Sequence, residues 1–133
     1  MKDAKQALIE AKAVLVDQGW TQGVYEREGA KGLGSKRTYC AIGALNRVLL
    51  LDENNQLLPV RKRGAYLEEN GVWTEAIRHL ASCISDEEID FESLHEDDYE
   101  VRIILFNDMD ERKKEQILEK FDCAIGSFDA TSR

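Results

Sequence analysis

Apolar residues recur at helical spacing in several segments of this chain, and only one segment suits a strand equally well. The first apolar stripe follows the spacing i, i+3, i+4, i+7 and i+11 and consists of Ala4, Ala7, Leu8, Ala11 and Leu15. It predicts a helix over 3–18 that Gly19 closes. With four or five helical patterns a parallel sheet would have too few strands, so the sequence favours a mainly helical domain.

Three more helices are expected downstream. Residues 39–51 carry a second apolar stripe, made of Ala41, Ala44, Leu45, Val48 and Leu49. A helix over 75–84 follows, with Trp73 placed to staple its entry. The last helix begins after an Asp110 cap and ends at Gly126.

The remaining segments are harder to assign. Residues 57–71 stay open, and 86–98 are expected to form an acidic connection with one short helical turn. The apolar run 99–107 suits either a buried strand or a helix, because periodicity does not separate short apolar runs. The expected fold is a mainly α, compact single domain of four to five helices, with at most one short strand or hairpin. Its globular part covers 1–126, and 127–133 form a frayed tail.

Length and composition fit one globular domain. A chain of 133 residues with 43% hydrophobic residues buries roughly two thirds of the surface that its unfolded form exposes. The longest apolar runs, 48–51 and 103–106, are far shorter than the roughly 20 residues that cross a bilayer, so no membrane span is expected. Cys40, Cys83 and Cys123 show no paired spacing and no leader-like segment precedes them, which predicts reduced thiols in a cytoplasmic protein.

The charge balance is acidic, with a net charge of −8. This argues against direct nucleic-acid binding, because phosphates are met by Lys and Arg. The excess is concentrated between Asp86 and Glu100, where nine carboxylates occur without a Lys or Arg. The segment predicts either a solvated, self-repelling connector or a docking surface for a basic protein, with Glu96, Asp97 and Asp98 as contacts.

Cys40 stands near the start of the helix expected over 39–51, two residues after Thr38, which is a good cap. There the helix dipole would lower the pKa of the thiol, as in a reactive cysteine. A cysteine nucleophile also needs a base, and neither His79 nor His95 is linked to Cys40 by spacing. Packing is therefore the favoured role of Cys40, and no catalytic residue is identified.

A small anion site is a further hypothesis at the same helix start. Lys36 and Arg37 lie just before the helix, whose N-terminus attracts negative charge. Gln22 either satisfies exposed helix ends or contacts such a ligand. The glycine-rich loop 29–36 lacks the Gly-Lys-Ser/Thr ending of a phosphate-binding loop, so a flexible loop is favoured. The candidate ligand residues are Gln22, Lys36, Arg37 and Cys40.

No metal site or cofactor is predicted. A calcium loop counted from Asp108 would need a Gly at its sixth position and a Glu at its twelfth, but Lys113 stands at the sixth and Glu119 at the twelfth. No Cys or His pair has zinc-ligand spacing. Asp108 or Asp110 is instead expected to cap the last helix.

Three short motifs stand in order along the chain: Gly19-Trp20-Thr21-Gln22-Gly23, Tyr39-Cys40-Ala41-Ile42-Gly43-Ala44-Leu45 and Phe106-Asn107-Asp108. They resemble the landmarks of a family of small bacterial and phage proteins of unknown function, in which a Trp takes the place of Phe106. The residues around 61–71 match nothing in that pattern. The resemblance implies a mostly helical domain but no activity. It also implies that five side chains meet, as a buried network or a small site: Trp20, Gln22, Cys40, Asn107 and Asp108.

Two function classes follow from the sequence. The first is a noncatalytic interaction protein, phage or prophage encoded, whose acidic segment 86–100 binds a basic host protein. The alternative is a small-molecule or nucleotide binder with an anion site near Lys36, Arg37 and the helix start at Cys40. The first is favoured because the second lacks a recognisable catalytic set.

Overall fold

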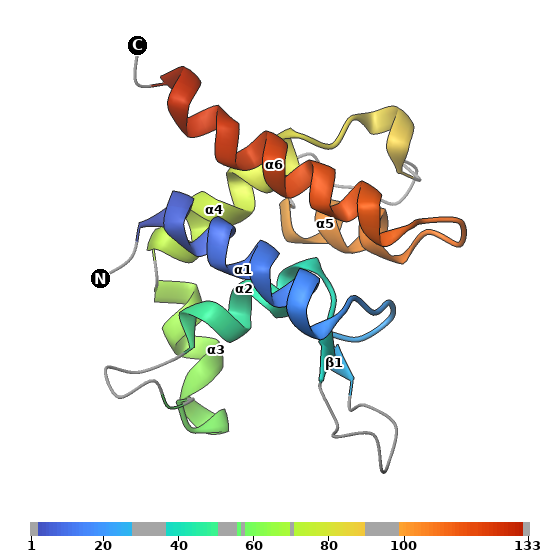
Figure 1. Cartoon of the computed structure of the whole chain (residues 1–133). Helices are drawn as coiled ribbons and strands as arrows, with labels where there is room; N and C mark the ends of the chain where they lie inside the picture. The colour runs from blue at the N-terminus through green and yellow to red at the C-terminus, as the bar shows by residue number, and fades with distance from the viewer. Residues whose placement is uncertain are drawn as a thin grey trace.

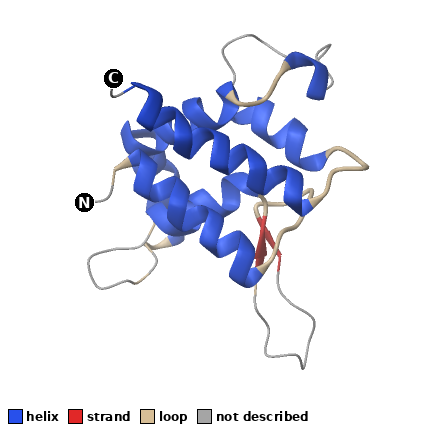
Figure 2. Ribbon diagram, turned by 45° about the horizontal axis from the view of Figure 1, so that its top comes forward, coloured by secondary structure: helices blue, strands red, loops and turns tan. Residues whose placement is uncertain are grey.

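Six α-helices, one short hairpin and one 3-10 turn make up the secondary structure of the residues that the computed structural model describes (Figures 1 and 2). These residues are 3–27, 37–50, 56, 58–69, 71–89 and 99–131. The helices are α1 (Ala4–Gln18), α2 (Ala41–Leu49), α3 (Val60–Glu69), α4 (Gly71–Ser82), α5 (Tyr99–Asp108) and α6 (Lys114–Thr131). The hairpin pairs β1 (Glu26–Arg27) antiparallel with β2 (Thr38–Tyr39), and the 3-10 turn η1 covers Asp86–Glu88. The prediction of a mainly helical fold with a short hairpin is confirmed, with six helices in the described residues where four to five were expected.

α1 begins and ends where the sequence predicts. The carboxylate of Asp3 accepts a hydrogen bond from the backbone N–H of Gln6 at 2.8 Å and so caps the first turn. The helix ends at Gly19, whose φ of 112° suits glycine and strains other residues. All five residues of the predicted stripe are buried, so α1 gives one complete apolar face to the core.

α2 is capped by Cys40 and not, as predicted, by Thr38. Thr38 lies in β2, and Sγ of Cys40 accepts a hydrogen bond from the backbone N–H of Gly43 at 3.3 Å. Gly43 is needed here because a Cβ at this position would collide with the carbonyl of Tyr25. The backbone before β1 therefore lies directly against the first turn of α2.

Two helices start elsewhere than predicted. α4 already begins at Gly71, so Trp73 lies inside the helix rather than before it. Its indole donates a hydrogen bond to Oδ1 of Asn46 at 2.9 Å, and this tie to α2 replaces the expected staple. α6 begins at Lys114, so the expected cap at Asp110 is wrong.

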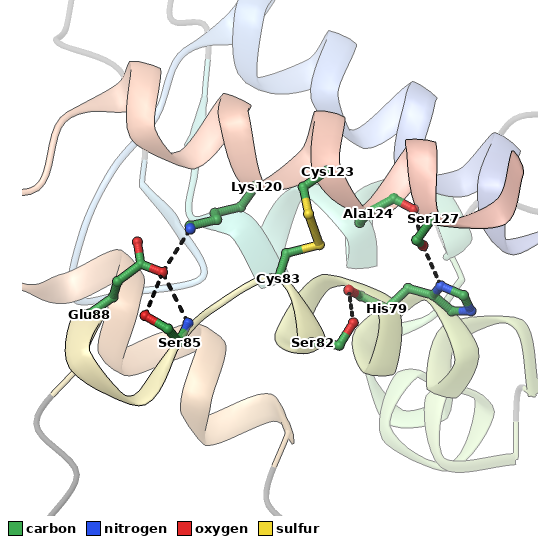
Figure 3. Close-up of a disulfide and its surroundings, with 9 residues drawn as sticks. All are labelled: His79, Ser82, Cys83, Ser85, Glu88, Lys120, Cys123, Ala124 and Ser127. Carbon is green, nitrogen blue, oxygen red and sulfur yellow. Dashed lines mark hydrogen bonds and ion pairs between the residues drawn. A yellow bond between two sulfur atoms is a disulfide. The ribbon is translucent and has the colours of Figure 1, made fainter. Parts of the chain in front are cut away.

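Gly126 does not end α6, which continues to Thr131. The cause is tertiary contact with α4. Oγ of Ser127 lies 2.6 Å from Nδ1 of His79 (Figure 3), and the ring of Phe128 stacks on that of His79 with 3.9 Å between centroids. Because packing stabilises helix ends that propensity alone leaves marginal, the chain is helical where a frayed tail was expected.

The two segments that the sequence did not assign, 57–71 and 99–107, both contain a helix. α3 lies within 57–71, and α5 settles the run 99–107 as a helix rather than a strand. α5 buries Ile103, Phe106 and Asn107 on its inner side. η1 supplies the short helical turn expected in the acidic connection.

A disulfide joins Cys83, just after α4, to Cys123 on α6 (Figure 3). The prediction of three reduced thiols is therefore wrong for these two, and Cys40 is the free cysteine. Local spacing could not reveal the bond because the two cysteines are 40 residues apart. Packing of α4 on α6 brings their Cα atoms to 6.1 Å, within the usual range for a disulfide.

The core lies where α1 meets α2, α4 and α6, while α5 packs against α2 and α4. Its buried residues form one cluster that extends from Ala4 to Ala124. Figure 1 shows the hairpin beyond the C-terminal end of α1, away from α3. Among the described helices none is long and apolar enough to cross a membrane. The boundary of an independent domain at 1–126 stays a prediction.

Candidate functional site

Asn107 lies near the C-terminal end of α5 and is only 1% exposed. Its Oδ1 accepts hydrogen bonds from the indole Nε1 of Trp20 at 2.7 Å and from the backbone N–H of Ala41 at 3.0 Å. Its Nδ2 donates to the carbonyl of Thr21 at 3.1 Å and to Oδ1 of Asp108 at 2.9 Å. Every hydrogen-bonding position of the amide is thus used, as burial of a polar group requires.

Two more residues tie the turn after α1 to the same end of α5. Nε2 of Gln22 donates to the carbonyls of Asn107 and Met109, both at 2.9 Å. The backbone N–H of Gly23 donates to Oδ1 of Asp108 at 3.0 Å. The last carbonyls of a helix lack partners within it, so Gln22 satisfies a helix end, which is one of its two expected roles.

These contacts join three segments that are far apart in the sequence: the turn 19–23, the start of α2 and the end of α5. We call them the Asn107 network, which comprises Trp20, Thr21, Gln22, Gly23, Ala41, Asn107 and Asp108. Cys40, the residue before Ala41, lies beside the network. Of the five landmark side chains expected to meet, Trp20, Gln22, Asn107 and Asp108 do so through hydrogen bonds centred on the buried Asn107, and Cys40 stands next to them.

A cavity of about 430 Å³ adjoins the Asn107 network. Its walls are the segment 23–25, the start of α2 and one face of α5, and its lining is mainly apolar. The lining residues are Gly23, Val24, Tyr25, Cys40, Ile42, Ile104, Asn107 and Asp108. Val24, Tyr25 and Asp108 are exposed, so these residues mark the side on which the cavity meets solvent. Its size falls in the range of small-molecule sites.

Tyr25 fastens the outer wall of the cavity to the first turn of α5. Its hydroxyl donates a hydrogen bond to Oε1 of Glu100 at 3.1 Å. Because Gly23 is bonded to Asp108 at the other end of α5, the segment 23–25 is held at both ends of the helix, with Ile104 between them. Burial and then the neighbouring Glu100 carboxylate raise the pKa of Tyr25 to about 12, so at neutral pH the phenol stays protonated and continues to donate.

Cys40 lines the cavity but is not an activated thiol. Its side chain is 5% exposed, and burial raises the pKa of the thiol by more than the backbone N–H of Gly43 lowers it. A protonated thiol is a weak nucleophile. The lowered pKa that a reactive cysteine would require is absent, and the thiol serves as the N-cap of α2.

The described residues of the expected anion site are engaged elsewhere. Gln22 is bonded to the end of α5, and Cys40 caps α2. Nη1 of Arg37 forms an ion pair with Glu26 at 3.2 Å. Lys36 lies outside the described residues, so its part in an anion site stays a prediction.

The predicted partner surface falls largely outside the described part of the chain, which does not include Glu96, Asp97 or Asp98. Two acidic residues of η1 have cationic partners. Asp86 pairs with Arg102 at 2.7 Å. Glu88 pairs with Lys120 at 2.8 Å, as Figure 3 shows. These two carboxylates are therefore partly neutralised within the protein.

No group of three or more His, Cys, Asp or Glu side chains is placed to hold a metal ion among the described residues. Asp108, which opens the calcium-like run, neither caps α6 nor gathers other carboxylates. Its carboxylate accepts from Gly23 and Asn107 instead, so the expectation that Asp108 caps the last helix is wrong.

Sequence reasoning missed three residues around the cavity: Tyr25, Glu100 and Ile104. A signal was present, because Glu100, Ile104 and Asp108 follow the spacing i, i+4 and i+8 and share one face once the segment is read as a helix. Tyr25 carries no such signal, since its contact with Glu100 depends on where the turn after α1 places it.

Fold and site together define a small helical protein with an apolar, solvent-open cavity framed by a buried hydrogen-bond network. The chain belongs to a family of unknown function (DUF6197), whose family model matches residues 1–127. The resemblance seen in the three motifs is thereby confirmed as membership of a family of unknown function. No curated protein and no solved structure matches the chain.

Proposed function

We propose that this protein is a binding protein for a small molecule with a mainly apolar body, which occupies the cavity beside the Asn107 network. The observation that carries the proposal is the cavity itself, with its volume of about 430 Å³ and its apolar lining. A few polar side chains interrupt this lining, among them Asn107 and Asp108. An apolar pocket with a few convergent polar groups is the usual form of a small-molecule site.

The Asn107 network supports this proposal because it fixes the segments that form the cavity walls relative to one another. Protein interiors are close-packed, and voids larger than a water molecule are few. Here the turn 19–23, the start of α2 and the end of α5 are fixed to one another by a fully bonded amide. A rigid frame around an apolar space preorganises the site and reduces what binding costs in lost freedom.

The proposed role is noncatalytic. The thiol of Cys40 is protonated and engaged as a cap, and His79 is engaged with Ser127 and Phe128 at the contact of α4 with α6. A nucleophile and a base within reach of each other are the minimum for covalent catalysis. The described lining of the cavity offers no such pair.

A fragment screen by thermal unfolding tests the proposal, with Ile104→Phe as the variant that fills the cavity and Ile9→Phe, on the exposed side of α1, as the matched control. A ligand at about 100 times its Kd adds about 2.7 kcal/mol to the free energy of unfolding. At least one apolar fragment should raise the Tm of the native chain and of Ile9→Phe but not of Ile104→Phe. Equal stabilisation of all three, or no stabilisation by any fragment, would refute the proposal.

Protein binding through the acidic segment is a second candidate function. Nine carboxylates lie between Asp86 and Glu100, and that stretch of the sequence contains no Lys or Arg. In this proposal a phage- or prophage-encoded chain binds a basic host protein through Glu96, Asp97 and Asp98. A pull-down from host lysate at low and at high salt, with these three residues changed to Lys, tests it. Retention of a basic protein by the native chain at low salt alone would support it, and retention that the Lys variant keeps would not.

A cytoplasmic location also stays a proposal. The sequence supports it through the lack of paired cysteine spacing and of a leader-like segment, and the disulfide between Cys83 and Cys123 removes the first of these grounds. Disulfides persist in oxidising compartments and are rare where thiols are kept reduced. Cell fractionation followed by thiol labelling of the protein in each fraction tests the location and the state of the two cysteines together.

A further inference from the structure

We propose that the ligand of this cavity is an organic cation, an amine whose ammonium group meets Asp108 at the mouth while its apolar body enters the cavity; this rests on the proposed function above. Among the eight described residues that line the cavity, Asp108 is the one with a charge, and no Lys or Arg is among them. A pocket that offers one carboxylate and otherwise apolar walls selects for positive charge on its ligand.

The carboxylate of Asp108 is fixed in place on one side only. Its Oδ1 accepts from the backbone N–H of Gly23 at 3.0 Å and from Nδ2 of Asn107 at 2.9 Å. Among the described residues no hydrogen bond is made to its Oδ2. A carboxylate held by one oxygen keeps acceptor capacity on the other, which is where an ammonium N–H would bond.

Tyr25 adds a second feature that favours a cation. It lines the same cavity and is 48% exposed, so it belongs, like Asp108, to the side on which the cavity meets solvent. The face of an aromatic ring attracts ammonium groups, most strongly where water is partly excluded. The hydroxyl of Tyr25 donates to Glu100, whose carboxylate adds negative charge on the same side of α5.

The charges around the cavity disfavour an anion. Arg37, the described cation of the expected anion site, is paired with Glu26. The net charge of −8 gives the whole molecule a field that attracts cations. An anionic ligand would be repelled by the carboxylate of Asp108 and by the net negative charge of the protein.

Three probes with the same phenyl body and different charges test the inference by titration calorimetry: 2-phenylethylamine, 2-phenylethanol and 3-phenylpropanoate. We expect the amine to bind about fivefold tighter than the alcohol, because an ion pair at an exposed mouth is a modest contribution, and the carboxylate to bind most weakly. Added salt should reduce the affinity for the amine and leave that for the alcohol unchanged.

The variant Asp108→Asn removes the negative charge and tests its role. The side-chain carbonyl of the new amide can still accept the hydrogen bond from Gly23. This variant should bring the amine and the alcohol to within about twofold of each other without weakening the alcohol. Tyr25→Leu, which keeps Asp108, should also reduce the preference for the amine and gives a second test if Asp108→Asn is unstable. Equal binding of amine and alcohol by the native chain would overturn the cation inference and leave the proposed function standing. Failure of all three probes to bind would overturn both.

Discussion

Asn107 is the residue on which three separate segments converge, and its burial explains why an amide stands there. An amide both donates and accepts, so one side chain can serve the indole of Trp20, the first N–H of α2 and the carbonyl of Thr21 at once. An apolar residue of the same size would leave these groups without partners. The geometry of the cavity therefore depends on a single side chain.

Replacement of Asn107 by Ala should lower the free energy of unfolding by about 3 kcal/mol, because several buried groups lose their partners together. Denaturant unfolding monitored by circular dichroism measures the loss. Asn46→Ala is the matched control, since Asn46 also accepts from an indole, that of Trp73, but this is the one side-chain hydrogen bond that Asn46 makes among the described residues. We expect about 1 kcal/mol there. Equal losses in the two variants would contradict the central place of Asn107.

The site residues could be foreseen to different degrees from the sequence. The three motifs brought Trp20, Gln22, Cys40, Asn107 and Asp108 together, although Trp20 and Asn107 are 87 positions apart. Their roles were less accessible. Sγ of Cys40 turned out to be the cap itself, and Asp108 bonds backward to Gly23 rather than forward to α6. Local propensity identifies good cap residues but does not say which backbone N–H the fold brings within reach.

At the scale of elements, packing between α4 and α6 decides where α6 ends. Gly126 is a common terminator, and its presence predicted an end that the contacts of Ser127 and Phe128 with His79 override. Conversely, α1 was foreseen almost to the residue because its cap, its stripe and its terminal glycine agree. Helix boundaries are predictable where local signals agree and unpredictable where a tertiary contact outweighs one of them.

Gly126→Ala should therefore raise the free energy of unfolding by about 0.5–1 kcal/mol, because alanine is the better residue inside a helix. The added Cβ meets no atom within 4 Å. Thermal unfolding compared with Gly71→Ala, where the glycine is the first residue of α4 and equally open, measures the effect. Loss of stability in Gly126→Ala would indicate instead that the helix ends there in a left-handed turn.

The disulfide should make a large contribution to stability by closing a loop of 40 residues. Reduction of Cys83–Cys123 should lower the free energy of unfolding by about 4 kcal/mol in the chain-entropy estimate. Denaturant titrations with and without dithiothreitol measure the difference. The double variant Cys83→Ala with Cys123→Ala should be insensitive to dithiothreitol. A native chain that is equally insensitive would contradict the disulfide.

At the scale of the whole molecule, the charges of the acidic segment are partly bound to the helical body. Glu88 accepts hydrogen bonds from Lys120 and from Ser85 (Figure 3). The bond from Lys120 joins η1 to α6. Burial by itself raises the pKa of Glu88, but the hydrogen bonds from Lys120 and Ser85 outweigh it and hold the pKa below its ordinary value. Part of the stability of this protein therefore depends on an ionised carboxylate.

The sign of the pH dependence follows from that lowered pKa. Such a carboxylate contributes stability above its unfolded pKa, and the contribution is lost as the pH falls through its folded pKa. Glu88→Gln should lower the free energy of unfolding by about 1 kcal/mol at neutral pH, a modest value because solvent screens the pair. The difference from the native chain should shrink as the pH falls and vanish once the pH lies below the lowered pKa that Glu88 has in the folded protein. Glu87→Gln, one position earlier, is the control, and a Glu88→Gln deficit that persists at low pH would contradict the ion pair.

The sequence predicted the fold class and four of the six described helices, because an apolar helical stripe can be recognised from residues a few positions apart. The cavity could not be predicted, since it arises from the way the turn after α1 crosses α5. The disulfide was missed because it too depends on tertiary packing. The contact of α4 with α6 brings together two cysteines whose spacing in the sequence indicates no pairing. What the sequence did contain was the motif set that forms the frame of the cavity.

The most direct test of the cavity as the ligand site is a two-dimensional ¹H–¹⁵N correlation titration of the chain with 2-phenylethylamine. If the cavity is the site, the shifted backbone amides will cluster at its walls, in Val24, Ile42, Ile104 and Asp108, and Asn107→Ala will abolish the effect. Shifts confined to α3 and α6, or an unchanged spectrum at millimolar probe, would show that the cavity beside Asn107 is not where this protein binds small molecules.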